Sequence, residues 1–239
     1  MPHEKISAIL LAGGSGKRMH SDIPKQYMLL GEKPVLCYSL AAFDQSRVDE
    51  IILVANKNDM EYLNDKILKQ YPAEKPVHLV PGGEERYYSV YNGLKRAADS
   101  DYVLIHDGAR PFITAEMIEN VIASLKEHPA CAVGVPVKDT IKIVDTTRTI
   151  IETPDRNMVW AVQTPQAFSL PLILRAYDML MEDLKNESQA EKTQVTDDTM
   201  VLEYSLHYPV KMIMGSYSNI KITTPEDMLM GEALLHREN

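Results

Sequence analysis

Continuous runs of apolar residues recur along this chain, and they do not alternate with polar residues. The runs are residues 6–12, 50–55, 77–83, 102–108 and 131–137. Segments of helical length, with apolar residues three and four apart, lie between them at 34–45, 59–71, 86–98 and 114–128. Runs of this kind are typical of strands buried on both faces, as in a parallel sheet covered by helices. The βαβα order predicts an α/β fold with a doubly wound, mostly parallel sheet.

The pattern changes after Val137. Residues 139–155 read as two alternating strands around a polar turn at 145–148, which predicts a β-hairpin inserted into the α/β pattern. The hairpin is either an ordinary surface ribbon or an arm that packs against a second subunit, because an isolated two-stranded ribbon is only marginally stable in water. We expect a single domain over residues 1–239, with a β-arm at about 138–157.

The last third of the chain returns to alternating helices and strands. We expect helices at 170–186 and 197–205, a solvated helix end at 185–194 and a strand at 210–216. Residues 219–237 read as a short strand followed by a helix. That helix has a clear start, because Thr224 can cap it and Pro225 suits its first position.

The composition limits the classes of partner. The chain has 25 Lys and Arg residues against 34 Asp and Glu residues, a formal net charge of −9. Nucleic acid and anionic membranes are therefore not expected as partners, and an anionic substrate has to be held by local cations. The only two cysteines, Cys37 and Cys131, stand in apolar surroundings, which is typical of reduced thiols in a cytoplasmic protein. Nowhere do about 18 apolar residues run together, so no transmembrane helix is expected.

The first apolar run leads into a glycine-rich loop, ILLAGGSGKRM at residues 9–19. A P-loop needs glycine where Leu11 stands, and it needs Ser or Thr where Arg18 follows Lys17, so that motif is excluded. The dinucleotide fingerprint G-x-G-x-x-G fits weakly, because Met19 takes the position of the third glycine.

The loop can instead bind phosphate through its backbone. Glycine has no Cβ and allows positive φ, so successive N–H groups can turn toward one anion. Lys17, Arg18 and Lys25 add cations nearby. The sequence therefore predicts a phosphate-binding loop, and the alternative is a tight turn between a strand and a helix.

Seven segments together resemble one enzyme family. They read LAGGSGKRM…PKQY, PGGEERYYSVYNGL, HDGARP, PVKDTIK, DRNMVWAVQTPQAF, TDD and NIKITTPEDM. Over nearly the whole chain, and in the expected order, they resemble the 2-C-methyl-D-erythritol 4-phosphate cytidylyltransferases of the non-mevalonate isoprenoid pathway. The resemblance implies a Rossmann-like fold of the nucleotidyltransferase type, a homodimer and a requirement for Mg²⁺. It also implies transfer of CMP from CTP to 2-C-methyl-D-erythritol 4-phosphate, giving 4-diphosphocytidyl-2-C-methyl-D-erythritol and pyrophosphate.

The resemblance also assigns roles to residues. The catalytic residues it implies are Arg18, Lys25, Arg156 and Lys221. Those implied for CTP are Ala12, Gly13, Gly14, Ser15, Gly16, Lys25, Pro81, Gly82, Gly83, Arg86, Ser89 and Asp107. Those implied for the sugar phosphate are Asp107, Arg110, Thr140, Arg156, Thr164 and Lys221. Asp107 is also the candidate Mg²⁺ ligand, and Thr140 and Arg156 on the arm are expected to complete the partner's site.

The implied chemistry agrees with these residue types. A phosphate monoester has a second pKa near 6, so the attacking oxygen is largely ionised at neutral pH and needs no general base. The barrier lies in the repulsion between two polyanions, which calls for fixed cations and a metal. We read His106 as structural. Two alternatives stay open, a ribitol-5-phosphate cytidylyltransferase and a non-catalytic nucleotide-binding module on the same fold.

Overall fold

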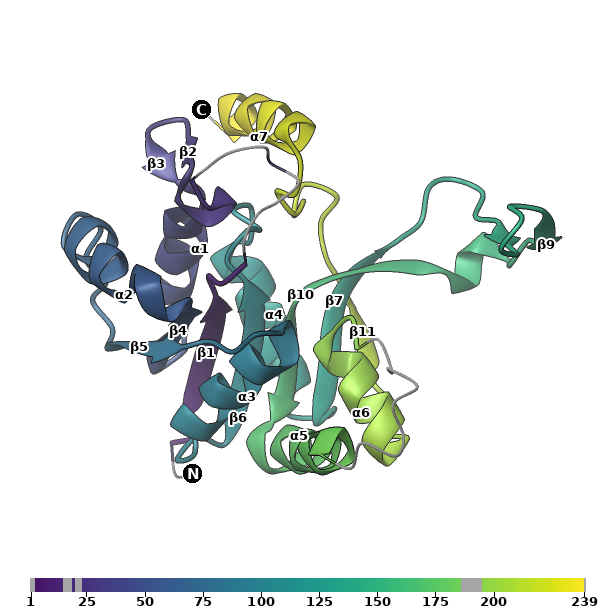
Figure 1. The fold of residues 1–239 in the computed structure, drawn as a ribbon, viewed down its shortest axis with the longest axis horizontal. Helices are drawn as coiled ribbons and strands as arrows, with labels where there is room; N and C mark the ends of the chain where they lie inside the picture. Colours follow the sequence, from purple (N-terminus) through teal and green to yellow (C-terminus); the bar gives the residue numbers. More distant parts are fainter. Residues whose placement is uncertain (1–2, 15–18, 20–22, 186–194, 239) are drawn as a thin grey trace.

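The computed structural model describes residues 3–14, 19, 23–185 and 195–238 of the chain. Within this part, seven strands form one sheet with helices on both faces (Figure 1). The strands are β1 Ile6–Leu11, β4 Glu50–Ala55, β5 Val77–Pro81, β6 Tyr102–Asp107, β7 Ala130–Pro136, β10 Trp160–Ser169 and β11 Lys211–Met214. Their order is β11-β7-β10-β6-β1-β4-β5, and every pairing is parallel except those of β10. The prediction of a mostly parallel α/β sheet is confirmed.

Helices cover the two faces because successive strand residues point to opposite sides. In β1, Leu10 belongs to one buried cluster and Ile9 to the other. The first cluster is closed by α1 Val35–Asp44, by α2 Met60–Tyr62 with its π-helical continuation η4 Leu63–Leu68, and by α4 Ala115–Ser124. The second cluster is closed by α3 Arg86–Arg96, α5 Leu170–Lys185 and α6 Asp198–Leu206. Burial on both faces explains why the strand sequences are continuously apolar.

The last helix, α7 Pro225–Glu238, begins at the residue that the sequence predicted. The carboxylate of Asp227 accepts hydrogen bonds from the N–H groups of Thr223 and Thr224, at 2.8 and 2.9 Å, and so caps the first turn. The helix lies over a third apolar cluster that includes Leu30 and Ile222. It therefore covers the end of the domain next to the carboxyl edge of the sheet (Figure 1).

The prediction of a short strand ahead of this helix is wrong. Residues 215–224 are irregular. Single hydrogen bonds hold them instead of a ladder, with Ile222 N–H donating to Ala109 O at 2.8 Å and the Asn219 side chain donating to Thr164 O at 3.0 Å. The segment is therefore fastened by single bonds to the loop after β6 and to β10, without pairing as a strand.

Strand β10 was not predicted, although it lies between β6 and β7 and is antiparallel to both. Its sequence contains Pro165, and proline within a run argues against a central strand. The structure accommodates the proline by a register shift between Val162 and Gln166 in the pairing with β7.

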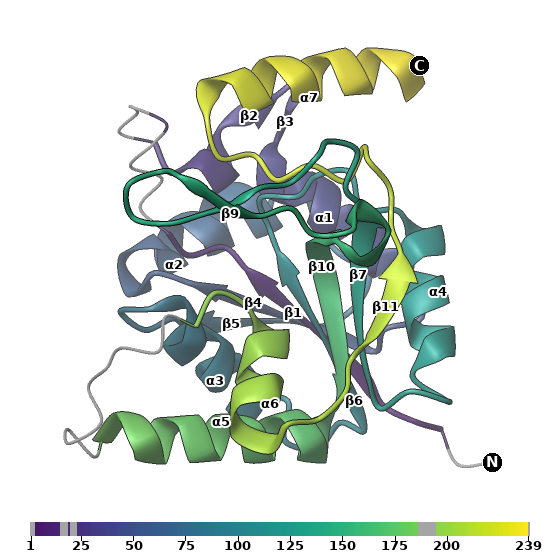
Figure 2. The ribbon, with the colours of Figure 1, turned by 90° about the vertical axis from the view of Figure 1, so that its right-hand side faces the viewer.

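The inserted hairpin is present, with shorter strands than the sequence predicted. Its strands are β8 Ile143–Val144 and β9 Ile150–Glu152. The hairpin projects away from the sheet in Figure 1 and lies in front of it in Figure 2. A second small hairpin, β2 Leu29–Leu30 with β3 Lys33–Pro34, was not predicted. The expected solvated helix end at 185–194 lies outside the described residues except for Lys185, where α5 ends.

Both cysteines are free and buried, as expected. Burial raises the pKa of each thiol, Cys37 and Cys131, to about 12. Among the helices that the structure describes, none is long and apolar enough to cross a membrane.

A buried carboxylate ties the amino ends of three strands together. Glu50, at the start of β4, accepts from the Ser7 hydroxyl at 2.7 Å and lies 3.0 Å from the Lys5 ammonium and 3.2 Å from His78 Nε2. Burial raises the pKa of Glu50, but the hydrogen bonds from Ser7 and Lys5 and the Lys5 charge outweigh it, so the pKa is lowered. The ionised form is therefore the one that stabilises the fold.

We predict that Glu50→Gln lowers the free energy of unfolding by about 1–3 kcal/mol at neutral pH, because the amide cannot replace the charge. Since the folded pKa is below the unfolded one, this contribution is present above the unfolded pKa and is lost as pH falls through the folded pKa. Urea unfolding at several pH values should show the deficit shrinking as the pH falls below about 4. The exposed Glu127→Gln is the control, and an equal loss in both variants would contradict the prediction.

Candidate active site

The glycine loop leaves β1 at the carboxyl edge of the sheet. Ala12 N–H donates to Val54 O at 2.7 Å, and Ala12 O accepts from the buried Gln26 side chain at 2.6 Å. Gly14 has a φ of 125°, which favours glycine, and no Cβ covers the backbone at Gly13 or Gly14. The start of the loop is therefore fixed, while its backbone is left open to an approaching anion.

Four residues of the predicted phosphate site lie outside the described residues. They are Ser15, Gly16, Lys17 and Arg18, and their roles stay predictions. Lys25 opens the short helix η2 Lys25–Tyr27 directly before Gln26, and Gln26 binds the first residue of the loop. Lys25 is thus next in sequence to the residue that holds the glycine loop, and its role at the phosphates stays a prediction.

The second predicted loop, after β5, is held by the helix that follows it. Gly82 N–H donates to Ala55 O at 2.7 Å, and Gly83 N–H donates to the Ser89 hydroxyl oxygen at 3.0 Å. The Asn92 side chain donates to Pro81 O at 3.0 Å. A Cβ added at Gly83 would lie 2.3 Å from Tyr88 Cβ, so only glycine fits this turn. The turn at residues 81–83 is therefore held rigidly by Ser89 of the following helix. It lies at the same carboxyl edge of the sheet as Ala12.

Asp107 ends β6 and lies between cations. Its Oδ2 is 2.6 Å from Lys221 Nζ, and its Oδ1 is 3.5 Å from Arg86 Nε. The residue is only 9% exposed. Burial raises its pKa, but the charges of Arg86 and Lys221 hold the pKa of this carboxyl well below its usual range. Asp107 is therefore ionised at any working pH.

Arg86 carries the second ion pair of this cluster. Its NH1 and NH2 groups donate to the two carboxylate oxygens of Asp198 at 2.8 and 2.7 Å. Burial lowers the pKa of Arg86, but the two carboxylates raise it well above its ordinary value. The guanidinium fork thus faces Asp198, and only Nε is directed toward Asp107.

Arg110 is fastened by backbone carbonyls. Its NH1 donates to Asn219 O at 2.9 Å and its NH2 to Val162 O at 3.5 Å, while its buried Nε has no partner among the described atoms. Burial lowers the pKa of Arg110. Its backbone N–H donates to Asp107 O at 2.9 Å, so Arg110 lies next to Asp107, and its predicted contact with the sugar phosphate stays a prediction.

Thr164 joins β10 to the end of β6. Its hydroxyl oxygen accepts from Asp107 N–H at 3.1 Å and lies 3.0 Å from His106 Nδ1, while His106 Nε2 lies 3.3 Å from Arg110 O. Burial lowers the pKa of His106 to about 4, so the ring is neutral. Since a carbonyl only accepts, Nε2 donates to Arg110 O, and Nδ1 accepts from the Thr164 hydroxyl. His106 is thus structural, as expected.

The two arm residues do not join this cluster within the chain. Thr140 and Arg156 are exposed, and Arg156 NH1 donates to Lys138 O at 3.3 Å, which is also on the arm. The arm extends away from the sheet edge (Figure 1). Their predicted contact with the sugar phosphate therefore requires a second subunit and stays a prediction.

The comparisons with known proteins agree with this geometry. The family model for 2-C-methyl-D-erythritol 4-phosphate cytidylyltransferase matches residues 6–237. The chain belongs to this family. A relative of that name from Lachnoclostridium phytofermentans is 49% identical over 97% of both chains, and one from Clostridium botulinum is 48% identical over 97% of this chain and all of the relative.

Solved structures give the same result. The chain resembles the crystal structure of 4-diphosphocytidyl-2C-methyl-D-erythritol synthase from Anaerococcus prevotii, with a TM-score of 0.83, 36% identity, and 98% and 99% of the two chains covered. The cytidylyltransferase is therefore an enzyme that transfers CMP from CTP to 2-C-methyl-D-erythritol 4-phosphate in isoprenoid biosynthesis. These matches do not support the two alternatives that the sequence left open, a ribitol-5-phosphate cytidylyltransferase and a non-catalytic nucleotide-binding module.

Three residues of the site were not identified from the sequence. Asp198 pairs with Arg86, Asn219 holds Arg110 and Thr164, and Gln26 holds the glycine loop. Asp198 and Asn219 stand in segments that carried the family resemblance, but an isolated Asp or Asn gives no sign of its partner. Only the folded chain brings them to the site.

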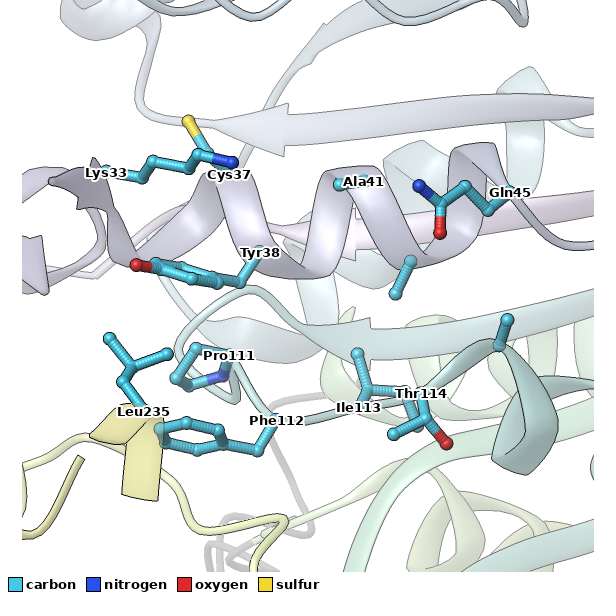
Figure 3. Close-up of a pocket in the computed structure, with 12 residues that line it drawn as sticks. Lys33, Cys37, Tyr38, Ala41, Gln45, Pro111, Phe112, Ile113, Thr114 and Leu235 are labelled. Carbon is cyan, nitrogen blue, oxygen red and sulfur yellow. The ribbon is translucent and has the colours of Figure 1, made fainter. Parts of the chain in front are cut away.

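A separate pocket lies away from these residues (Figure 3). It is formed between α1 and the connection from β6 to α4, with Tyr38, Cys37 and Phe112 among its lining residues. None of the predicted site residues lines it. The candidate active site is therefore the charged cluster at the carboxyl edge rather than this hollow.

We predict that Thr164→Val lowers the free energy of unfolding by about 1–3 kcal/mol, because Asp107 N–H and His106 Nδ1 lose a partner. We also expect kcat to fall by about tenfold, because Asp107 is then less firmly positioned. Urea unfolding and steady-state kinetics would measure both. Thr164→Ser keeps the hydroxyl and is the control, so equal losses in the two variants would contradict this reading of the hydroxyl.

Proposed function

We propose that the cluster around Asp107 is where the phosphate oxygen of 2-C-methyl-D-erythritol 4-phosphate attacks the α-phosphorus of CTP. The observation that carries this proposal is the gathering of three cations, Arg86, Arg110 and Lys221, around one carboxylate in a chain of net charge −9. Fixed cations in a partly buried site stabilise transferring phosphoryl groups. The glycine loop with Lys25 binds the triphosphate, and the turn at 81–83 receives the cytosine.

In this mechanism no side chain removes a proton from the nucleophile. The phosphate monoester is largely ionised at neutral pH, because its second pKa is near 6. Within the described residues, the histidine next to the site is His106, which is buried and neutral and has both ring nitrogens occupied. Lys221 and Arg110 bind the sugar phosphate, and the cations of the glycine loop neutralise the charge that develops on the leaving pyrophosphate.

We propose Mg²⁺ as the metal of this reaction. In the part of the chain that the structure describes, no three His, Cys, Asp or Glu side chains gather into a metal-binding group. Mg²⁺ does not need such a group, since it binds through one or two carboxylates together with substrate phosphates and waters. Asp107 supplies one carboxylate at the edge where the triphosphate is expected, so the donor set fits. When bound, the ion supplies charge neutralisation at the phosphates.

The cytidylyltransferase is proposed to act as a homodimer joined through the β-arm, residues 138–157. Large apolar side chains of the arm are exposed, namely Ile143, Val144, Ile150 and Ile151. Exposed apolar patches of this kind mark interaction surfaces, and a lone hairpin is only marginally stable. In such a dimer Thr140 and Arg156 contact the sugar phosphate in the partner's site.

A cytoplasmic location is also proposed. It is supported by two free thiols, Cys37 and Cys131, which remain buried and unpaired within the described chain. Reduced cysteines are typical of the cytosol.

Pyrophosphate release with CTP and Mg²⁺ tests the function. We expect kcat/KM for 2-C-methyl-D-erythritol 4-phosphate to exceed that for D-ribitol 5-phosphate by at least about 100-fold, because pocket contacts discriminate between the polyols. Lys221→Met is the control for the site. We expect its turnover to fall about 100-fold, while calorimetry still shows that it binds CTP. A preference for ribitol phosphate, or full turnover in the Lys221 variant, would overturn the assignment.

Mixing inactive variants tests the shared site. We predict that co-expressed Arg18→Ala and Arg156→Ala subunits recover about one quarter of the wild-type activity, because half of the dimers are mixed and each mixed dimer has one intact site. Arg18→Ala with Lys25→Ala is the matched control, since both residues belong to the same subunit's loop and no intact site can form. Absence of recovery in the first pair would exclude an arm that completes the partner's site.

A further inference from the structure

Asp198 is a buried carboxylate that no step of the reaction uses. It opens α6 and is 0% exposed. Its Oδ1 accepts from the Tyr177 hydroxyl of α5 at 2.6 Å, and its backbone N–H donates to Gln166 Oε1 of β10 at 2.9 Å. Two elements outside α6 therefore fix this carboxylate in place. A charge buried this firmly costs stability unless it has a specific partner.

The partner is the guanidinium of Arg86, which lies between Asp198 and Asp107. Two N–H groups form the fork to Asp198 at 2.8 and 2.7 Å, and Nε stands 3.5 Å from Asp107 Oδ1. Asp107 in turn holds Lys221 at 2.6 Å. Four side chains of alternating charge thus run from the helix α6 to the candidate active site.

The two hydrogen bonds from Arg86 to Asp198 determine which cation the Asp107 carboxylate pairs with. A guanidinium binds a carboxylate best through two parallel N–H donors, and both of these donors of Arg86 are occupied by Asp198. Arg86 therefore offers Asp107 only a single, longer contact, and the Asp107 carboxylate remains close to Lys221. Without the Asp198 charge, the free fork would be next to Asp107 and would compete with Lys221 for it.

We infer that Asp198 is a positioning residue for cytidylyl transfer, which acts by binding the Arg86 fork and thereby keeping Asp107 paired with Lys221. The inference rests on the proposed roles of Asp107 and Lys221. Arg86 then serves mainly as a link between α6 and the site, in place of the direct CTP contact that the family resemblance implies.

The test compares two substitutions at the same buried carboxylate. Asp198→Asn removes the charge that holds the fork, whereas Tyr177→Phe removes one hydrogen bond to Asp198 and leaves the fork bound. We expect Asp198→Asn to lower kcat about 10- to 100-fold, as misplacement of reacting groups does, with KM for CTP changed by less than about threefold. Tyr177→Phe should lower the melting temperature and leave kcat within about threefold of wild type. Equal effects of the two variants on kcat would overturn the inference.

A double-mutant cycle tests whether the effect passes through Arg86. In an Arg86→Gln background, Asp198→Asn should cause no further loss of kcat, because no fork is left to release. A loss of the same size in both backgrounds would show a role independent of Arg86 and overturn the inference. If Asp198→Asn does not fold, Asp198→Glu keeps the charge and displaces the carboxylate by one methylene. That variant should lose kcat at least about fivefold, and unchanged kcat would be contrary to the inference.

Asp107→Asn separates this inference from the proposed function on which it rests. If that variant keeps its turnover, the proposed role of Asp107 is wrong and the inference fails with it. If it loses turnover while Asp198→Asn does not, the proposed function stands and only the positioning role of Asp198 is lost.

Discussion

The parallel pairing of β1 with β6, in which Leu11 lies opposite Asp107, is the constraint on which the site depends. β4 pairs with the other side of β1, and β5 follows with Pro81 opposite Ala55. Three connections, after β1, β5 and β6, therefore leave the sheet at one edge, where ligands bind in open α/β sheets. A shift of one residue in this register would move the glycine loop away from the carboxylate and turn the strand side chains to the wrong face.

The cations at this edge are each held before any substrate arrives. Lys221 is held by Asp107, Arg86 by Asp198, and Arg110 by the carbonyl of Asn219. Like charges this close would otherwise repel one another, and the carboxylates between them offset that repulsion. An acidic protein can in this way maintain a local site for two polyanionic substrates, without relying on its overall field.

The fold was largely predictable because most strands are continuous apolar runs and most helices have apolar residues three and four apart. Two errors came from segments whose structure depends on distant partners. β10 contains Pro165, and only its register shift makes the proline acceptable in the middle of the sheet. Residues 219–222 look like a strand, but single hydrogen bonds to Ala109, in the loop after β6, and to Thr164 of β10 hold them. For the site, the family resemblance assigned Asp107 and Lys221, whereas Asp198 was not recognised, because its partner lies 112 positions away in the chain.

The fork between Arg86 and Asp198 also restricts how this sequence can change over evolutionary time. Replacing either residue alone leaves a buried charge without its partner, which costs about 3–5 kcal/mol, a large fraction of the stability of a typical domain. Neutral drift at one position is therefore blocked unless the other changes as well. Among homologous chains, positions 86 and 198 should vary together or not at all, although they are far apart in sequence and one of them lies outside the loops that receive the substrates.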